Sequence, residues 1–326
     1  MRKILVTGAA GQIGSELVPA LRQLYGDENV IAAGHRTPMP DDVRESGPAI
    51  TVDVTDVASV QRAVRDHDVG TVYHMSSLLS ALAETNRQRA HAVNIEGLYN
   101  VLEAAVDNDV DQVIVPSSIA AFGPDTPPDN TPNETLQRPT TLYGISKVFG
   151  ELMGNYYVEK LGLDVRGLRL PGIISWKTEP TAGTTDYAVA IFYAAIRDGR
   201  YTCYLRPDTR LPMMYMPDCI KAIIDLARAD ASRLRHHTDF NVGAVSFTPA
   251  ELAEVIASRL PDFSIDYDVD PLRQGIADSW PNSLDDSAAR EEWDWNPSFD
   301  LDAMADDMLD NLSRKLAGEG RSDQEE

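Results

Sequence analysis

The sequence predicts an α/β protein: a doubly wound parallel sheet with a smaller C-terminal lobe. Two patterns support this fold class. In the first half, short apolar runs alternate with longer stretches of helical periodicity, as in consecutive βαβ units. After Leu170 the pattern loosens into a segment rich in Gly, Pro and Thr, which extends to Asp186 and is typical of a long functional loop. We expect a main domain over residues 1–170, a lobe over residues 171–317 that partly returns to the sheet, and a polar tail over residues 318–326.

The strands of the main domain are expected where apolar and β-branched residues form short runs between turn residues. These runs are Lys3–Thr7, Val30–Ala33, Ala49–Val52, Gly70–His74, Gln112–Pro116 and Val165–Leu170. Apolar spacing near 3.6 residues predicts the intervening helices, Gln12–Tyr25, Val57–Arg65, Gln88–Asp107 and Leu142–Leu161.

The lobe is expected to contain further helices at Tyr187–Arg197, Pro217–Arg228, Pro249–Arg259 and Leu301–Leu316. Asp218 and Thr248 are residue types that cap helix N-termini, and we expect them to do so for the second and third of these. The polar tail is expected to be frayed.

Composition excludes several classes of function. The 326 residues carry a formal net charge of −22, spread along the chain, whereas nucleic-acid binding needs clustered Lys and Arg. No apolar run reaches the roughly 20 residues that cross a bilayer, and no signal peptide is evident. Cys203 and Cys219 have no metal-ligand spacing and suit a reducing compartment. We therefore expect a cytoplasmic protein without nucleic-acid, membrane or metal binding, and the excess of Asp over Lys is typical of adaptation to high salt.

A glycine motif follows the first strand directly. Gly8, Gly11 and Gly14 have the spacing G-x-x-G-x-x-G, and Gln12 and Ile13 open the next helix. Glycines permit a tight turn and close approach of a pyrophosphate to the backbone, and the helix N-terminus favours anions. In this strand–turn–helix context, the motif predicts a Rossmann dinucleotide site.

A second motif predicts acid/base chemistry. Tyr143 and Lys147 lie four residues apart on a predicted helix, so both side chains share one face. An ammonium group near a phenol is expected to lower the phenol's pKa, so that Tyr143 can act as a base. Ser117 and Ser118 follow the fifth strand at the carboxyl edge of the same sheet, where ligands of such sheets bind. An amphipathic helix explains the tyrosine–lysine spacing alone, but not its combination with the glycine loop and the serines.

Together, these motifs resemble the extended short-chain dehydrogenase/reductases, which include NAD-dependent sugar-nucleotide epimerases and dehydratases. The resemblance implies that Ser118, counted back from Phe122-Gly123, completes a catalytic trio with Tyr143 and Lys147. It also implies a cofactor-facing fourth-strand edge at His74, Met75 and Ser76, and an asparagine of the following helix at Asn94. Asp53 and Val54, after the third strand, are expected at the adenine, although turn formation or helix capping explains Asp53 equally well.

Longer segments are similar to the short-chain type of L-threonine 3-dehydrogenase. The discriminating segments are Leu211–Asp218 and Gly183–Ala188, the latter within the longer matching segment Glu179–Ala188, and the others are Leu78–Ala81, Phe122–Pro124, Leu170–Ile174 and Trp280-Pro281. The resemblance implies oxidation of the threonine C3 hydroxyl to 2-amino-3-ketobutyrate, with Tyr143 as the base, and a homodimer paired through Gln88–Asp107 and Leu142–Leu161. Pro171, Gly172 and Ile173 would line the nicotinamide pocket. The expected substrate contacts are Ser80, Ser118, Tyr143, Gly172, Thr184, Thr185 and Trp280.

Two other functions remain open at this level. A sugar-nucleotide epimerase or dehydratase would share the catalytic residues, but its diphosphate needs cations, and the second half offers few beyond Arg200, Arg206 and Arg210. A non-catalytic dinucleotide sensor would not need the Tyr143–Lys147 pair.

Different features of the sequence favour different dinucleotides. NAD enzymes of this fold usually carry an acidic residue about 20 positions after the glycine loop, bonded to the ribose 2′-hydroxyl. Gly34 stands at that position, followed by His35 and Arg36, which could attract a 2′-phosphate. The overall resemblance favours NAD, which we take as the first choice, with NADP as the alternative.

Overall fold

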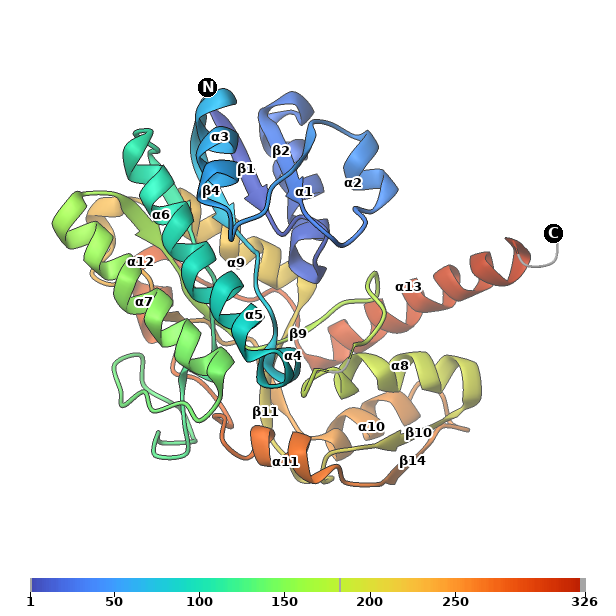
Figure 1. Cartoon of the computed structure of the whole chain (residues 1–326). Coiled ribbons are helices and arrows are strands. Elements are labelled where there is room, and N and C mark those ends of the chain that lie inside the picture. The colour runs from blue at the N-terminus through green and yellow to red at the C-terminus, as the bar shows by residue number, and fades with distance from the viewer. Residues whose placement is uncertain (1, 182, 323–326) are drawn as a thin grey trace.

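The computed structural model describes residues 2–181 and 183–322. Its main sheet has six parallel strands in the order β3-β2-β1-β4-β5-β7 (Figure 1). The strands are β1 (Lys3–Thr7), β2 (Val30–Gly34), β3 (Ala49–Thr51), β4 (Val69–His74), β5 (Gln112–Ile114) and β7 (Asp164–Arg166). The strand order reverses beside β1, which is the crevice where doubly wound folds bind dinucleotides. The predicted fold class is confirmed.

Helices cover both faces of this sheet because successive strand residues point to opposite sides. On β1, Ile4 and Val6 pack against α1 (Gln12–Tyr25) and α9 (Met216–Arg228). Leu5 faces the other way, into a cluster formed with α3 (Val57–Asp66), α6 (Gly97–Asp107) and α7 (Leu142–Leu161). The strands therefore read as continuous apolar runs in the sequence.

The long helix expected at Gln88–Asp107 is interrupted. It consists of α5 (Arg87–His91), a π-helical turn (Ala92–Glu96) and α6, which lies beside α7 (Figure 1). A π-turn inserts one residue into the helical repeat and is frequent at functional sites. Here it carries Asn94, which is buried.

The strand expected at Val165–Leu170 is in fact two strands. β7 ends at Arg166, and β8 (Leu168–Leu170) begins after Gly167, whose N–H donates to the carbonyl of His237. β7 pairs with β5, whereas β8 lies between β6 (Ser117–Ser118) and β12 (Phe240–Asn241). The change of partner at Gly167 is not visible in the apolar pattern.

The lobe has its own core. Tyr187, Phe192, Met213 and Phe247 are buried in it, together with apolar residues of three helices. Those helices are α8 (Tyr187–Asp198), α10 (Pro249–Ala257) and α13 (Leu301–Ser322). Its strands form a parallel pair, β10 (Arg200–Cys203) with β14 (Ser264–Tyr267), and a sheet of β9 (Gly172–Ile174), β11 (Leu211–Tyr215) and β13 (Val245–Phe247). The other short α-helices are α2 (Asp41–Glu45) and α4 (Ser80–Thr85), which precede the lobe in the chain, and α11 (Pro271–Ala277) and α12 (Ser287–Trp293), which follow α10.

One expectation about the lobe is wrong and one is confirmed. Asp218 does not cap α9; it lies in the first turn, and its carboxylate accepts the N–H groups of Ser298 and Phe299 at 2.8 and 3.0 Å. α13 extends to Ser322, beyond the expected end at Leu316, while residues 323–326 lie outside the described part of the chain. Thr248 does cap α10, in a capping box with Glu251.

Both cysteines are buried, as expected for small apolar residues. In the part of the chain that the structure describes, no helix combines the length and apolarity needed to span a membrane.

Candidate active site

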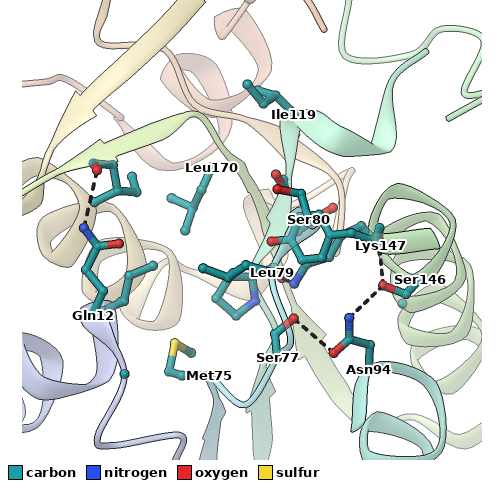
Figure 2. A pocket seen from close by; sticks show the side chains of 18 of the residues that line it. Gln12, Met75, Ser77, Leu79, Ser80, Asn94, Ile119, Ser146, Lys147 and Leu170 are labelled. Atoms are coloured by element: carbon teal, nitrogen blue, oxygen red, sulfur yellow. Dashed lines mark hydrogen bonds between the residues drawn. The ribbon is translucent and has the colours of Figure 1, made fainter. Parts of the chain in front are cut away.

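One elongated cavity follows the carboxyl edge of the main sheet. It begins at the glycine loop, passes the ends of β4 and β5, and reaches the lobe at β9 and the loop before α8. Figure 2 shows Gln12 and Met75 at one side of the cavity, with Lys147, Ser146 and Asn94 at the other. The expected residues that line it are Gly8, Gly11, Gln12, Ile13, Gly14, His74, Met75, Ser76, Ser80, Ser117, Ser118, Tyr143, Lys147, Pro171, Gly172, Ile173, Thr184, Thr185 and Trp280.

The glycine loop has the geometry that a pyrophosphate requires. Gly8 has a φ of +67°, and a Cβ there would approach the backbone of Met75 to 2.7 Å. A Cβ on Gly14 would lie 2.3 Å from the carbonyl oxygen of Gly8, so these two positions exclude other residues. No side chain caps the N-terminus of α1, and its first turn has no acidic residue. The helix dipole and free N–H groups are therefore directed at a site suited to an anion.

The residues expected at the adenosine end of the dinucleotide lie at the carboxyl ends of β2 and β3, outside the main cavity. One oxygen of Asp53 accepts hydrogen bonds from the backbone and hydroxyl of Thr55, and the other lies 3.6 Å from Nε2 of His35. Val54 is buried, and Arg36 is exposed. Asp53 thus stabilises a turn through one oxygen, while its other oxygen lies beside His35. This arrangement is compatible with turn formation and with the expected contact to the adenine.

Tyr143, Lys147 and Ser118 converge from two elements. Thr141 caps α7 through the N–H of Gly144, and a Cβ on Gly144 would lie only 2.1 Å from the carbonyl oxygen of Ala120. This close approach presses the first turn of α7 against the segment that follows Ser118. Nζ of Lys147 lies 5.3 Å from the centre of the Tyr143 ring and donates to the carbonyl of Pro116 at 2.8 Å.

Desolvation dominates the electrostatics of this group. It raises the pKa of Tyr143 to about 12, and the Ser118 hydroxyl beside it opposes this shift. It lowers the pKa of Lys147 to about 8, against the attraction of Glu151. The pKa of Tyr143 is therefore raised, opposite to the expected direction, because removal of the phenol from water dominates the shift.

Two buried polar residues support the cavity wall. His74 is neutral, since burial, aided by the charge of Lys147, lowers its pKa to about 3, and its Nδ1 pairs with the Thr7 hydroxyl at 2.9 Å. Asn94, carried by the π-helical turn, exchanges hydrogen bonds of 2.7 and 2.9 Å with the backbone of Leu78 and donates to Ser146 at 3.4 Å (Figure 2). Asn94 therefore fixes the segment that leads from β4 to Ser80.

The lobe contributes hydroxyls to the far wall of the cavity. Thr184 is buried, and its Oγ1 has no hydrogen-bond partner among the described residues. Thr185 packs against Gly172, Ser80 is the first residue of α4, and Trp280 lines the same end. A buried hydroxyl without a partner costs free energy, so Thr184 is the clearest indication of a polar ligand at this end.

Sequence reasoning missed the residues behind the catalytic trio. Ser117 lines the cavity, but its hydroxyl donates to Glu151, which also lines it. Glu151 follows Lys147 by four residues, so the face that carries Tyr143 and Lys147 continues to it. Gln12 was expected at the cofactor; in addition, its amide donates to the carbonyl of Ile173 at 3.4 Å, which links α1 to β9 across the cavity (Figure 2).

Within residues 2–181 and 183–322, no group of three or more His, Cys, Asp or Glu side chains is arranged to hold a metal ion.

The glycine loop, the reversal of strand order and the Tyr143–Lys147–Ser118 group define a site of the extended short-chain dehydrogenase/reductase type. The chain belongs to the NAD dependent epimerase/dehydratase family, whose model matches residues 4–243. A curated relative from Staphylococcus saprophyticus, described as an uncharacterized epimerase/dehydratase, is 49% identical over 319 residues, covering 98% of this chain and 99% of that protein.

Two solved structures are similar over nearly the whole chain. L-threonine dehydrogenase from Clostridium difficile has a TM-score of 0.94 at 51% identity, covering 97% of this chain and 98% of that one. L-threonine dehydrogenase from Phytophthora infestans has a TM-score of 0.92 at 48% identity, covering 96% and 99%.

Proposed function

We propose that this protein is an NAD-dependent L-threonine 3-dehydrogenase, which oxidises the C3 hydroxyl of L-threonine to 2-amino-3-ketobutyrate. The observation that carries the proposal is a cavity lined both by the Tyr143–Lys147–Ser118 group and by Thr184, whose buried hydroxyl has no partner among the described residues. The similarity to two L-threonine dehydrogenases at 48–51% identity supports it.

Each residue has a defined task in this reaction. The nicotinamide ring of the bound cofactor would accept the hydride from C3. Tyr143, as phenolate, takes the proton of the C3 hydroxyl, and the ammonium of Lys147 stabilises that phenolate and holds the nicotinamide ribose. Ser118 donates to the reacting oxygen and continues to do so as the carbonyl forms.

The remaining cavity residues suit the nicotinamide cofactor and the amino-acid substrate. His74, Met75, Ser76, Pro171 and Ile173 form the wall of the nicotinamide pocket. Thr184, Thr185 and Ser80 bind the charged ends of the amino acid, with Gly172 and Trp280 enclosing it. Hydroxyl groups suit this task because they can donate to a carboxylate and accept from an ammonium.

A sugar-nucleotide substrate fits less well. Its diphosphate needs cations, yet among the described residues Lys147 is the one cationic side chain that lines the cavity, since His74 is neutral. The three arginines that could have served are committed elsewhere: Arg200 pairs with Asp266, Arg206 with Asp278, and Arg210 with Glu251. None of the three lines the cavity.

We retain NAD as the first choice of cofactor and NADP as the alternative. Gly34 supplies no carboxylate at the end of β2, but Asp53, which follows the neighbouring strand β3, has an oxygen 3.6 Å from Nε2 of His35 that could also accept at the adenosine end. Arg36 is the candidate contact for a 2′-phosphate. The ratio of kcat/KM for the two cofactors decides between them.

We also propose that the protein forms a homodimer and is located in the cytoplasm. Ile145, Leu152 and Tyr156 on α7 and Tyr99 and Val106 on α6 are exposed large apolar side chains on two adjacent helices. Such a patch suits pairing with a second copy through these helices. Analytical ultracentrifugation, with Leu152→Glu as the disrupting variant, tests the dimer.

A parallel substrate screen tests the activity. L-threonine should support cofactor reduction, L-allo-threonine and serine less, and 2-hydroxy acids and UDP-glucose not at all. Interconversion of UDP-glucose without threonine oxidation would favour the epimerase, and dinucleotide binding without turnover of any substrate would favour the sensor.

A further inference from the structure

A buried ion pair lies directly behind the catalytic group. Glu151 on α7 and Arg169 on β8 are exposed by only 4% and 3%, and Arg169 donates to both carboxylate oxygens, through Nε at 2.9 Å and Nη2 at 2.8 Å. Gln137 donates to the second oxygen at 2.7 Å, and the Ser117 hydroxyl donates to the first. The carboxylate is thus fully engaged by groups from three other segments of the chain.

Stability alone does not account for this pair. The cost of desolvating two charges often equals or exceeds their attraction, so apolar residues of similar volume would stabilise this position as well or better. The pair also does not face bulk solvent, and the proposed reaction does not use it directly. Its position in the chain gives it another role.

Ser117 connects the pair to both halves of the catalytic group. The residue before it, Pro116, provides the carbonyl that accepts the Lys147 ammonium at 2.8 Å. The residue after it is Ser118, whose hydroxyl lies beside the Tyr143 phenol. Because the peptide units on either side of Ser117 are planar, holding its side chain restricts the movement of the Pro116 carbonyl on one side and of the Ser118 backbone on the other. Glu151 lies one helical turn from Lys147, so the same carboxylate is close to Lys147 and bonded to the residue that follows Pro116.

We propose that the Glu151–Arg169 pair is a positioning device for catalysis: it holds Ser117 and thereby sets the Pro116 carbonyl against Lys147 and the Ser118 hydroxyl against Tyr143. Arg169 is immobilised in turn by donating to the carbonyl of Asn133 at 2.6 Å and to the side chain of Asn241 at 3.2 Å. The device rests on the catalytic roles of the proposed function but adds residues that do not touch the substrate. Small displacements of catalytic groups are costly, so its loss should reduce turnover more than binding.

Two single variants test the device, because each removes one hydrogen bond to the same carboxylate. Ser117→Ala breaks the link to Pro116 and Ser118, whereas Gln137→Ala removes a bond from the loop before α7 and serves as the matched control. We expect Ser117→Ala to lower kcat about 10-fold or more, with KM for threonine and for the cofactor within about twofold of wild type. We expect Gln137→Ala to keep wild-type kcat.

A measurement without substrate or cofactor separates this proposal from the proposed function. Amide hydrogen exchange of the segment 115–119 in the ligand-free protein should be faster in Ser117→Ala and unchanged in Gln137→Ala. If the wild type does not oxidise threonine, the proposed function fails, yet the exchange comparison still decides whether Ser117 is held through Glu151.

The double variant Glu151→Leu/Arg169→Met distinguishes positioning from folding. It replaces the pair by apolar residues of similar size, so no unpaired charge remains; we expect a folded protein whose melting temperature is lowered because Asn133 and Asn241 lose their donor, with a kcat at least as low as that of Ser117→Ala. Wild-type kcat in Ser117→Ala, equal losses in Ser117→Ala and Gln137→Ala, or full kcat in a folded double variant would each overturn the proposal. If the double variant does not fold, the two single variants decide.

Discussion

The two halves of the cavity are built in different ways. The nucleotide side is made of backbone geometry: the Gly8–Gly14 turn, the open N-terminus of α1 and the strand ends of one parallel sheet. The lobe side is made of side-chain hydroxyls on a loop and on short elements, with Thr184 buried and unpartnered. In the proposed function, the backbone of the nucleotide side binds a feature common to all dinucleotides, whereas the hydroxyls of the lobe side bind one small substrate. Changes on the two sides should therefore separate in kinetics, and loss of the Tyr143 hydroxyl between them should lower turnover with little effect on dinucleotide affinity.

The largest expected effect is at the boundary between the halves. Tyr143→Phe removes the proposed base and should lower turnover roughly 100- to 10,000-fold while leaving dinucleotide affinity nearly intact. Tyr157→Phe is the matched control, since Tyr157 lies on the same helix and donates to Glu103, outside the cavity. Steady-state kinetics and fluorescence titration of the reduced cofactor measure both quantities. Wild-type turnover in Tyr143→Phe would remove the proposed base from the mechanism.

The dependence of kcat on pH should be almost as large an effect. Oxidation needs the phenolate, and burial raises the pKa of Tyr143 to about 12, so the base form becomes more populated as the pH rises. We expect kcat to rise close to 10-fold per pH unit from about pH 6 to 8. Above that range the rise should flatten, because Lys147, whose pKa burial lowers to about 8, loses the charge that stabilises the phenolate. A rate that is constant or falls from pH 6 to 8 would contradict this assignment.

A lobe variant should affect the substrate without affecting the cofactor. Thr184→Val keeps the volume of the side chain and removes the unpartnered hydroxyl, so KM for threonine should rise about 10-fold while the free energy of unfolding is unchanged or larger. Thr209→Val is the contrasting control, because the Thr209 hydroxyl already pairs with Gln274 outside the cavity. That variant should lose stability and keep KM. An unchanged KM in Thr184→Val would remove Thr184 from the substrate site.

The smallest effect is expected at the exposed end of the nucleotide site. Arg36→Ala should lower kcat/KM with NADP about 5-fold and change it less than twofold with NAD, because one exposed charge–phosphate contact contributes little. For each cofactor, the ratio of kcat/KM between Arg36→Ala and wild type should be the same at every threonine concentration used. A strong wild-type preference for NADP that Arg36→Ala abolishes would reverse our choice of NAD.

The same difference between the halves explains what the sequence could predict. Periodic apolar runs placed β1, α1 and α7 at their observed bounds, because in a sheet covered by helices on both faces the burial pattern follows secondary structure. The glycine loop was equally clear, since its backbone geometry restricts residue type. The longer helices after residue 171 were found, but the short helices α11 and α12 and the short strands were not, since elements of two to seven residues carry too little pattern.

Features that depend on tertiary partners were not predictable. The break at Gly167 follows from a new strand partner, and the π-helical turn at Asn94 from its packing against α7. Asp218 has the residue type of a cap, but its carboxylate is used by a segment 80 residues away. The pKa of Tyr143 is raised because the phenol is buried, which local sequence does not reveal. Glu151 could be suspected from its four-residue spacing to Lys147, but no local pattern pairs it with Arg169.

Transfer of a labelled hydride tests the central claim most directly. Wild-type protein is incubated with NAD and L-threonine carrying deuterium at C3, and the reduced cofactor is analysed by mass spectrometry. The proposed reaction predicts one deuterium in each reduced cofactor formed, and no reduction above background in Tyr143→Phe over the same interval. Absence of cofactor reduction, or reduced cofactor without deuterium, would contradict the assignment of this cavity to threonine oxidation.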